Sequence, residues 1–185
     1  MKDKINARLK TVAGTPMEIQ DVREAFVQSK PEAVILTLSA PQASDSLFAA
    51  VIAPARLMAD STANIVTITK KFGTSKIVIL QAFDVGESWI NMHRVLQLLM
   101  KKSNMIYQYN DHNLVAKETK ASAENYVLVR PPRLMEDETK EIKEYSNHGK
   151  GVSVLADITR DSVVKFLVDA AERSDWDNTA PVITN

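Results

Sequence analysis

The sequence predicts an α/β fold in which a parallel sheet is covered by helices on both faces. Three short and almost wholly apolar runs, at residues 33–38, 76–81 and 126–130, are typical of strands that are buried on both sides. Longer segments with helical periodicity separate these runs, which is the alternation expected of parallel strands joined by crossover helices. A length of 185 residues suits one domain spanning residues 1–185.

Helix caps and glycines divide the N-terminal half into elements. Thr15, Pro16 and Glu18 form a typical helix start, with an N-cap threonine, a proline at the first helical position and a glutamate three residues after the cap. Gly73 follows a segment with apolar residues at helical spacing, and glycine favours the left-handed conformation that closes many helices. The predicted order is a weak strand at 9–13, a helix from Thr15 with Ile19, Val22 and Phe26 inward, the strand at 33–38, a loop at 39–46 and a helix at 55–72.

The C-terminal half continues this alternation. Pro131 and Pro132 end its strongest strand, because proline cannot donate to a strand ladder. Asp161 is a suitable N-cap for a last helix. The predicted order is a strand at 76–81, a helix at 88–102 with Trp89, His93, Leu96 and Met100 on one face, a helix at 111–122, a strand at 126–130, a short strand at 151–155 and a helix at 161–172 with Val164, Phe166, Leu167 and Ala171 inward.

The composition argues against several classes of function. Lysine plus arginine and aspartate plus glutamate number 23 each, so no field of one sign favours a nucleic acid or a membrane surface as partner. There is no cysteine, and the three histidines show no ligand spacing with carboxylates, so we predict no metal site. The charged first residues and the lack of a long apolar stretch predict a cytoplasmic protein without a signal peptide or transmembrane segment.

Several phrases at predicted strand and helix ends carry a family resemblance. They are ARLMADS at 55–61, KIVILQAFDVGES at 76–88, YNDH at 109–112, VLVRPPRL at 127–134 and the last helix at 159–172. In this order they resemble the NmrA-like branch of the atypical short-chain dehydrogenases of filamentous fungi, which are relatives of flavin and biliverdin reductases. The resemblance implies a Rossmann-like parallel sheet and descent from NAD(P)-binding proteins.

This sequence lacks one feature that the resemblance implies. Such relatives begin with a strand, a glycine-rich turn and a helix, which together bind the pyrophosphate of the cofactor. The five glycines here give no GxGxxG spacing, and a strand-helix-strand unit of about 30 residues is missing before Lys10. We therefore expect a Rossmann-like sheet truncated by its first strand-helix-strand unit, either as a shortened chain or as a natural descendant without the cofactor.

One strand edge is expected to lack a partner, because the missing unit forms the middle of the sheet in the usual strand order 3-2-1-4-5-6. The strand that includes Val34 to Leu38 would then have an open edge, and an apolar edge strand is a template for pairing. Either the N-terminal segment or another chain must cover that edge. We predict a homodimer through the edge near Val34 to Leu38, or a rearranged sheet edge.

Two features of ordinary short-chain dehydrogenases are absent as well. These enzymes use a Tyr-x-x-x-Lys pair, in which the lysine lowers the pKa of the tyrosine for proton exchange with the substrate. At that spacing Tyr107 is followed by Asp111, and Tyr109 by Asn113. Gln81 stands where a strand end in such enzymes often carries a serine. We therefore predict no cofactor, with NADP as the alternative.

The most capable cluster of titratable side chains is Tyr109, Asp111 and His112. A histidine transfers protons near neutral pH, and a carboxylate can orient it. Asp84, in the loop after the 76–81 strand, lies on the carboxyl edge of the sheet, where ligands of open α/β folds bind. These four are the predicted catalytic residues, with helix capping, core packing and a solvated loop charge as the structural alternatives.

Six further side chains are predicted to contact a small-molecule substrate. Arg130 and Arg133 flank the double proline and are suited to bind a carboxylate or phosphate through paired hydrogen bonds, with a structural ion pair as the alternative. The other four are Ser39, Gln81, Phe83 and Trp89.

The joint absence of the glycine-rich loop, the Tyr-Lys pair and the strand-end serine favours a cofactor-independent cyclase or isomerase of secondary metabolism. Two alternatives stay open. One is an NAD(P)H-dependent reductase whose chain is truncated. The other is a non-catalytic NmrA-like protein with a regulatory or interaction role.

Overall fold

A three-stranded parallel sheet forms the centre of the protein. The computed structural model describes residues 10–44, 46, 48–83 and 85–185. The strands are β1 (Ala33–Leu36), β2 (Lys76–Leu80) and β3 (Tyr126–Val129), and they lie in the order β1-β2-β3. The predicted α/β class and its three central strands are confirmed.

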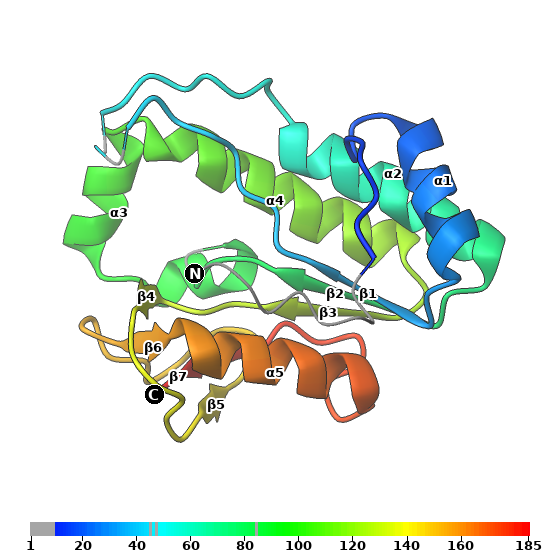
Figure 1. Cartoon of the computed structure of the whole chain (residues 1–185). Coiled ribbons are helices and arrows are strands. Elements are labelled where there is room, and N and C mark those ends of the chain that lie inside the picture. The colour runs from blue at the N-terminus through cyan, green and yellow to red at the C-terminus, as the bar shows by residue number, and fades with distance from the viewer. Residues whose placement is uncertain (1–9, 45, 47, 84) are drawn as a thin grey trace.

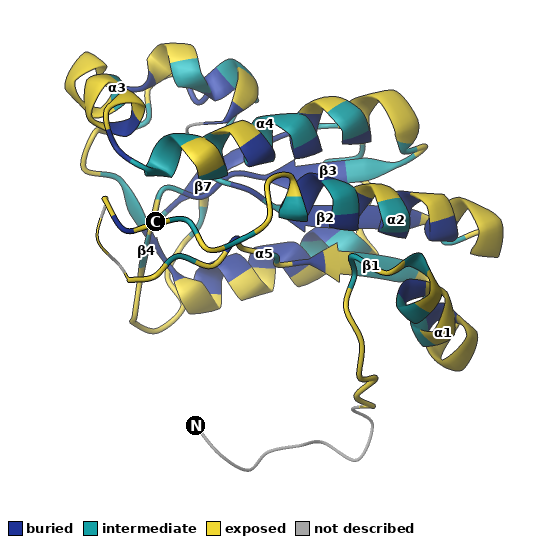
Figure 2. Ribbon diagram, turned by 90° about the horizontal axis from the view of Figure 1, so that it is seen from above, coloured by how far each residue is buried: buried dark blue, intermediate teal, exposed yellow. Residues whose placement is uncertain are grey.

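Helices cover both faces of this sheet (Figure 1). One face carries α2 (Leu57–Phe72) and α4 (Met105–Ser122), and α1 (Ile19–Ser29) packs against α2. The other face carries α5 (Arg160–Glu172). Figure 2 shows β2 and β3 largely buried between these layers and β1 partly exposed at the edge, with exposed residues on the outer sides of the helices.

Alternation along the strands supplies two apolar cores. Ile77, Ile79 and Leu128 belong to the core beneath α2 and α4, whereas Val78, Val127 and Val129 belong to the core beneath α5. Because both faces are covered, the strands read as continuous apolar runs, and each fully buried side chain contributes about 1.5–3 kcal/mol. This double burial is why the sequence located the strands well.

The two edges of the sheet differ. The chain at residues 178–183 runs beside β3, where the amide of Leu128 donates to the carbonyl of Thr179 and the amide of Arg130 donates to the carbonyl of Pro181. At the opposite edge β1 pairs with β2 alone, as far as the described residues show, and Ile35 is 39% exposed. Among the described residues, β1 therefore has one edge without a strand partner.

Four short strands escaped sequence prediction. β4 (Arg133–Met135) pairs in parallel with β6 (Asp157–Thr159), and β5 (Lys143–Tyr145) pairs antiparallel with β7 (Val182–Thr184). The strand predicted at 151–155 is wrong, because those residues lie in turns just before β6. These strands have three residues each and partners far away in sequence, so no local periodicity marks them.

The N-terminal elements begin later than predicted. Residues 10–13 of the predicted strand are not in a strand, and residue 9 lies outside the described residues. The helix α1 begins at Ile19 instead of Thr15, because the Thr15 hydroxyl accepts a hydrogen bond from the amide of Met17 and the Asp21 carboxylate accepts one from the amide of Thr15. These bonds hold a turn before the helix. Val22 and Phe26 are buried as predicted.

The single helix predicted at 88–102 is wrong. A 3-10 helix, η1 (Gly86–Asn91), is followed by a break at Met92 and His93 and then by α3 (Arg94–Lys101). The break is stabilised by His93, whose Nδ1 accepts a hydrogen bond from the amide of Val95 at 3.4 Å. Trp89 and Leu96 therefore do not share one helical face.

The last two long helices also begin earlier than predicted. α4 starts at Met105, before the predicted Asp111. In α5 the cap is Thr159, whose hydroxyl accepts from the amide of Ser162 at 3.2 Å, so the helix starts before Asp161. Val164, predicted inward, is 59% exposed because the helix buries Val163 instead.

Two kinds of structure are absent from the described residues. No helix there has both the length and the apolar character needed to cross a bilayer. No group of three or more histidine, cysteine, aspartate or glutamate side chains is placed to hold a metal ion in that part of the chain.

Candidate functional site

Polar side chains gather at the carboxyl edge of the sheet, at the end of two neighbouring strands. The register places Leu80 beside Val129, so Gln81 and Arg130 follow at equivalent positions of β2 and β3. Because side chains alternate along a strand, both continue the row of Ile79 and Leu128 on the α4 side of the sheet.

Gln81 is 4% exposed and only half satisfied. Its Nε2 donates to the backbone carbonyl of His112 on α4 at 2.9 Å. Its Oε1 is buried and has no hydrogen-bond partner in the described structure. Gln81 therefore ties β2 to α4 and leaves a buried acceptor at the strand end.

Arg130 is a fully buried cation. Its Nη1 donates to Glu87 Oε2 at 3.0 Å and to the backbone carbonyl of Asn147 at 3.1 Å. Nε and Nη2 find no partner among the described atoms. Burial lowers the pKa of Arg130 while Glu87 raises it, and an arginine stays charged under both influences.

Glu87 and Gly86 lie against Arg130, and the sequence analysis did not name either as a site residue. Glu87 also pairs with Lys120 of α4. Burial raises the pKa of Glu87, but hydrogen bonds from Lys120 and Arg130 outweigh it and lower the pKa to about 2. Gly86 has a φ of +61°, and a Cβ there would lie 2.8 Å from Arg130 Nη2. The start of η1 thus requires glycine next to the guanidinium.

Asp111 has a structural partner for each carboxylate oxygen. Its Oδ2 accepts from the amide of Met58 at 2.8 Å, and its Oδ1 accepts from the amide of Ala59 at 3.0 Å. Arg56 at the start of α2 provides no side-chain cap, so the buried Asp111 caps that helix from α4. The geometry favours the capping role over the predicted catalytic one.

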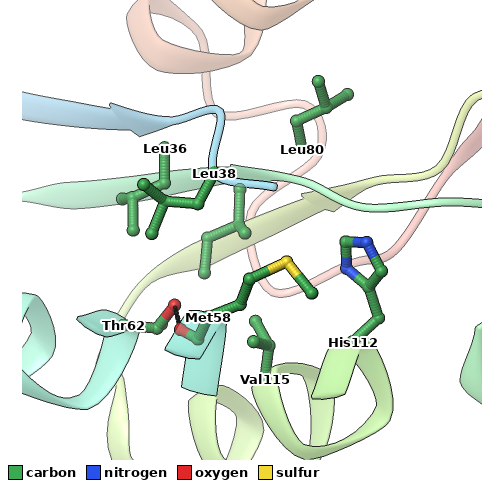
Figure 3. Close-up of a pocket in the computed structure, with 8 residues that line it drawn as sticks. Leu36, Leu38, Met58, Thr62, Leu80, His112 and Val115 are labelled. Carbon is green, nitrogen blue, oxygen red and sulfur yellow. Dashed lines mark hydrogen bonds between the residues drawn. The ribbon is translucent and has the colours of Figure 1, made fainter. Parts of the chain in front are cut away.

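His112 points from α4 toward the strands (Figure 3). It lines a cavity of about 10 Å³ together with Leu38, Met58 and Leu80. A space of this size holds about one water molecule and no substrate. Burial lowers the pKa of His112 below its usual value, while the nearby Asp111 carboxylate raises it less.

Tyr109 and Trp89 form an aromatic pair beside this edge. Their ring centroids lie 4.4 Å apart at an interplanar angle of 46°, and both residues are half-buried. Lys101 Nζ lies 5.7 Å from the centroid of the Trp89 ring. The pair joins α4 to η1 and leaves Tyr109 partly accessible.

The other predicted residues are dispersed. Ser39 is exposed beyond the end of β1, and Phe83 packs against Gly149. The Arg133 side chain is 70% exposed and its Nη2 lies 3.4 Å from Asp157 Oδ2, so it is separate from Arg130. Asp84 lies outside the described residues.

A larger cavity, of about 360 Å³, lies between α4 and the segment that follows β1. Its walls are mostly apolar and include Ala40, Val51, Pro54 and Leu114. The exposed Tyr107 also lines it, one turn before Asp111 on the same helix. Its volume lies within the range of small-molecule sites.

Comparison with known proteins identifies the family. A family of proteins described as NAD(P)H-binding matches residues 1–174. The chain belongs to this NAD(P)H-binding family. No curated protein matches the sequence.

Solved structures share the fold at low identity. A short-chain dehydrogenase/reductase from Veillonella parvula, in complex with NADP, has a TM-score of 0.73 and 13% identity over 98% of this chain and 74% of its own. ChuY, an anaerobillin reductase from Escherichia coli O157:H7, gives 0.68 and 11% over 93% and 73%. A putative NAD-dependent epimerase/dehydratase from Bacillus halodurans gives 0.64 and 17% over 94% and 71%.

These findings correct one sequence prediction and narrow another. The prediction that the chain binds no cofactor is wrong, because an NAD(P)H-binding family matches nearly its whole length. The error came from treating the missing glycine-rich loop, Tyr-Lys pair and strand-end serine as decisive, although the family match extends over residues 1–174. The Rossmann-type NAD(P)H-binding family is shown, whereas its NmrA-like branch and a fungal origin are not.

The sheet of the described residues has the strand order of one mononucleotide-binding half of a doubly wound fold. A doubly wound sheet binds each mononucleotide with one βαβαβ half. The order β1-β2-β3 runs in one direction and corresponds to one such half. Its carboxyl edge offers the unpartnered Gln81 Oε1 and Arg130 nitrogens, which suit the hydrogen-bonding groups of a nicotinamide, whereas the sequence has no glycine-rich turn for the pyrophosphate.

Proposed function

We propose that this protein is an NAD(P)H-dependent reductase of a small molecule, with the nicotinamide half of the cofactor at the carboxyl edge of β1, β2 and β3. The observation that carries the proposal is the match of the NAD(P)H-binding family to residues 1–174. The bound cofactor would supply a hydride. The polar groups at this edge support the placement, because ligands of open α/β sheets bind there.

The chain's own residues divide the work. Gln81 and Arg130 hold the nicotinamide side of the ligand, since both end in buried polar atoms without partners in the described chain. Tyr109 delivers a proton to the reduced substrate, because it is half-buried at this edge and carries a hydroxyl group. His112 lines a cavity that is too small for a substrate, so we assign it a packing role beside the site. The apolar cavity beside α4 receives the body of the substrate.

The two tryptophans give a direct binding test. Trp89 lies at the carboxyl edge, whereas Trp176 packs against Phe166 of α5 on the other face. NADPH absorbs the emission of a nearby tryptophan, so bound NADPH should quench Trp89. We expect Trp176→Phe to retain the quenching on titration with NADPH and Trp89→Phe to lose most of it.

The same titration provides the contradicting results. Saturable quenching that survives in Trp89→Phe and disappears in Trp176→Phe would place the cofactor elsewhere. Absence of saturable quenching, together with no heat of binding by calorimetry, would reject NAD(P)H binding by this chain.

We also propose that two copies associate through the open edge of β1. The one-sided pairing of β1 and the exposed Ile35 support this, because an unpaired apolar edge favours strand addition. A symmetric pair would align the two β1 strands antiparallel and form a continuous sheet.

Light scattering coupled to gel filtration tests this association. We expect a dimer mass for the natural sequence and a monomer mass for Ile35→Lys, with Val164→Lys on the exposed side of α5 as control. A single monomer mass across micromolar concentrations of the natural protein would contradict the proposal.

A further inference from the structure

We infer that Gln81 and Arg130 form a recognition pair for an amide group of the ligand. The inference rests on the proposed function for its location, and it names the chemistry that this edge of the sheet selects. The amide oxygen would accept hydrogen bonds from Arg130, and the amide N–H would donate to Gln81 Oε1.

The first support is that both side chains are buried with unused hydrogen-bonding capacity. Arg130 is fully buried with Nε and Nη2 unpartnered, and Gln81 is 4% exposed with Oε1 unpartnered, as judged over the described residues. An unpaired buried polar atom costs about 1–3 kcal/mol, and more when it is charged. Such atoms are retained where a bound group completes them.

The second support is their relative placement. Gln81 and Arg130 occupy equivalent positions after β2 and β3. Neighbouring strands of a sheet lie about 4.8 Å apart. Both project to the side of α4, where Gln81 bonds to the His112 carbonyl. The proposal places one planar group between these two side chains, with a hydrogen bond to each.

The third support is that the two side chains require opposite hydrogen-bonding characters. The Arg130 nitrogens are donors, and Gln81 Oε1 is an acceptor. A carboxylate or an ester satisfies the arginine and offers no hydrogen to the glutamine. An amide supplies both an acceptor oxygen and an N–H.

In this proposal the amide group of the ligand reaches Gln81 and Arg130 from the side of η1. Glu87 is the outer neighbour of Arg130, and its side chain is 37% exposed, whereas the Arg130 side chain is fully buried. Gly86 places backbone directly against the guanidinium. Displacement of η1 by the ligand would uncover Nε and Nη2 while Nη1 keeps its bond to the Asn147 carbonyl.

Two sources supply an amide of this kind, and matched ligand pairs separate them. The first pair is NADPH and its reduced 3-acetylpyridine analogue, which keeps the acceptor oxygen and lacks the amide N–H. The second pair is δ-valerolactam and δ-valerolactone, which stand for a substrate with and without the N–H. Dissociation constants for all four are measured by NMR titration of the full chain.

The variants are Gln81→Met and, as control, Asn64→Leu. Asn64 also donates its side-chain amide to backbone carbonyls, those of Pro16 at 3.0 Å and Met17 at 2.9 Å, so the control loses structural hydrogen bonds where α2 meets the turn before α1. We expect the natural protein to bind the amide member of at least one pair about tenfold more tightly. Gln81→Met should abolish that preference, and Asn64→Leu should keep it.

The outcomes are distinct. A preference within the NADPH pair assigns the amide to the cofactor. A preference confined to the lactam pair, with no binding of NADPH, supports the recognition pair and rejects the proposed function. Equal binding within both pairs, binding of none of the four, or a preference that persists in Gln81→Met overturns the inference. Quenching of Trp89 by NADPH without any amide preference leaves the proposed function standing and rejects the recognition pair.

Discussion

Two cations are buried in neighbouring strands at opposite ends of the sheet. At the amino end of β2, Lys76 Nζ lies 2.5 Å from Asp177 Oδ1, and it donates to the carbonyl of Arg173 at 2.5 Å and to that of Ala170 at 3.3 Å. At the carboxyl end of β3, Arg130 uses one nitrogen and leaves two without partners among the described atoms. Both residues are almost inaccessible to solvent.

The difference separates a structural cation from one with capacity for a ligand. An ammonium group has three donors, and Lys76 meets three acceptors, so it closes the end of α5 onto β2. Arg130 is buried as well, but its Nε and Nη2 lack hydrogen-bond partners among the described atoms. The contrast supports the proposal that the amino end of the sheet anchors the fold and the carboxyl end recognises a ligand.

The largest expected effect is at the amino end. Lys76→Met leaves the Asp177 carboxylate without its cation and the α5 carbonyls without their donor, so we expect a loss of about 3 kcal/mol in the free energy of unfolding. Urea denaturation measures it. In the absence of urea, the NADPH affinity of the folded variant should stay within twofold of that of the natural protein. A large loss of affinity would contradict the purely structural role of Lys76.

The second effect tests whether Asp111 caps α2 or takes part in catalysis. Asp111→Ala removes both side-chain acceptors from the first turn of α2, so the free energy of unfolding should fall by about 2 kcal/mol. NADPH affinity should change little in the folded protein. Unchanged stability with a lost reductase activity would restore the catalytic interpretation of this residue.

The third effect concerns Gly86. In Gly86→Ala a non-glycine residue takes a φ of +61° and its Cβ meets Arg130 Nη2, so we expect a loss of about 1–2 kcal/mol in stability. The displaced guanidinium should also weaken NADPH binding. Gly73→Ala is the control, because that glycine has a similar φ and no atom within 4 Å of the added Cβ. Equal NADPH affinities in Gly86→Ala and Gly73→Ala would contradict a contact between Arg130 and the ligand.

The smallest effect is a change in the pH dependence of stability. Burial lowers the pKa of His112 below 6.5, so the unfolded chain binds a proton before the folded one as the pH falls. Stability is then complete above pH 6.5 and decreases as the pH falls through the folded pKa. His112→Gln should flatten urea midpoints between pH 7 and pH 5, and His148→Gln, on an exposed turn, should not. A steeper pH dependence in His112→Gln would contradict this sign.

Sequence reasoning located what local pattern determines and missed what distant contacts determine. Continuous apolar runs identified β1, β2 and β3, because strands buried on both faces carry that signature. The break before α3 was missed, since Asn91 at the end of η1 donates to the backbone carbonyl of His148, which is 57 residues away in the chain. The partners of Arg130 were missed for the same reason, because Glu87 and Asn147 are 43 and 17 residues away in the chain.

The cofactor prediction failed for a related reason. The sequence has no glycine-rich turn, no Tyr-Lys pair and no strand-end serine, and these local absences were taken to exclude the whole ligand. The family match covers residues 1–174, so it does not depend on one turn alone. Arg130 was correctly placed at a strand end, yet its burial and its unpartnered nitrogens depend on residues that no motif brings together.

The most direct measurement is a map of backbone amide shifts in two-dimensional NMR spectra as NADPH is added to the full chain. If the carboxyl edge binds the nicotinamide, the largest shifts will fall at Gln81, Gly86 and Arg130, and the amides around Lys76 and Asp177 will stay in place. Shifts centred on Lys76 and Asp177, or no shift at saturating NADPH, would contradict the assignment of recognition to the carboxyl end.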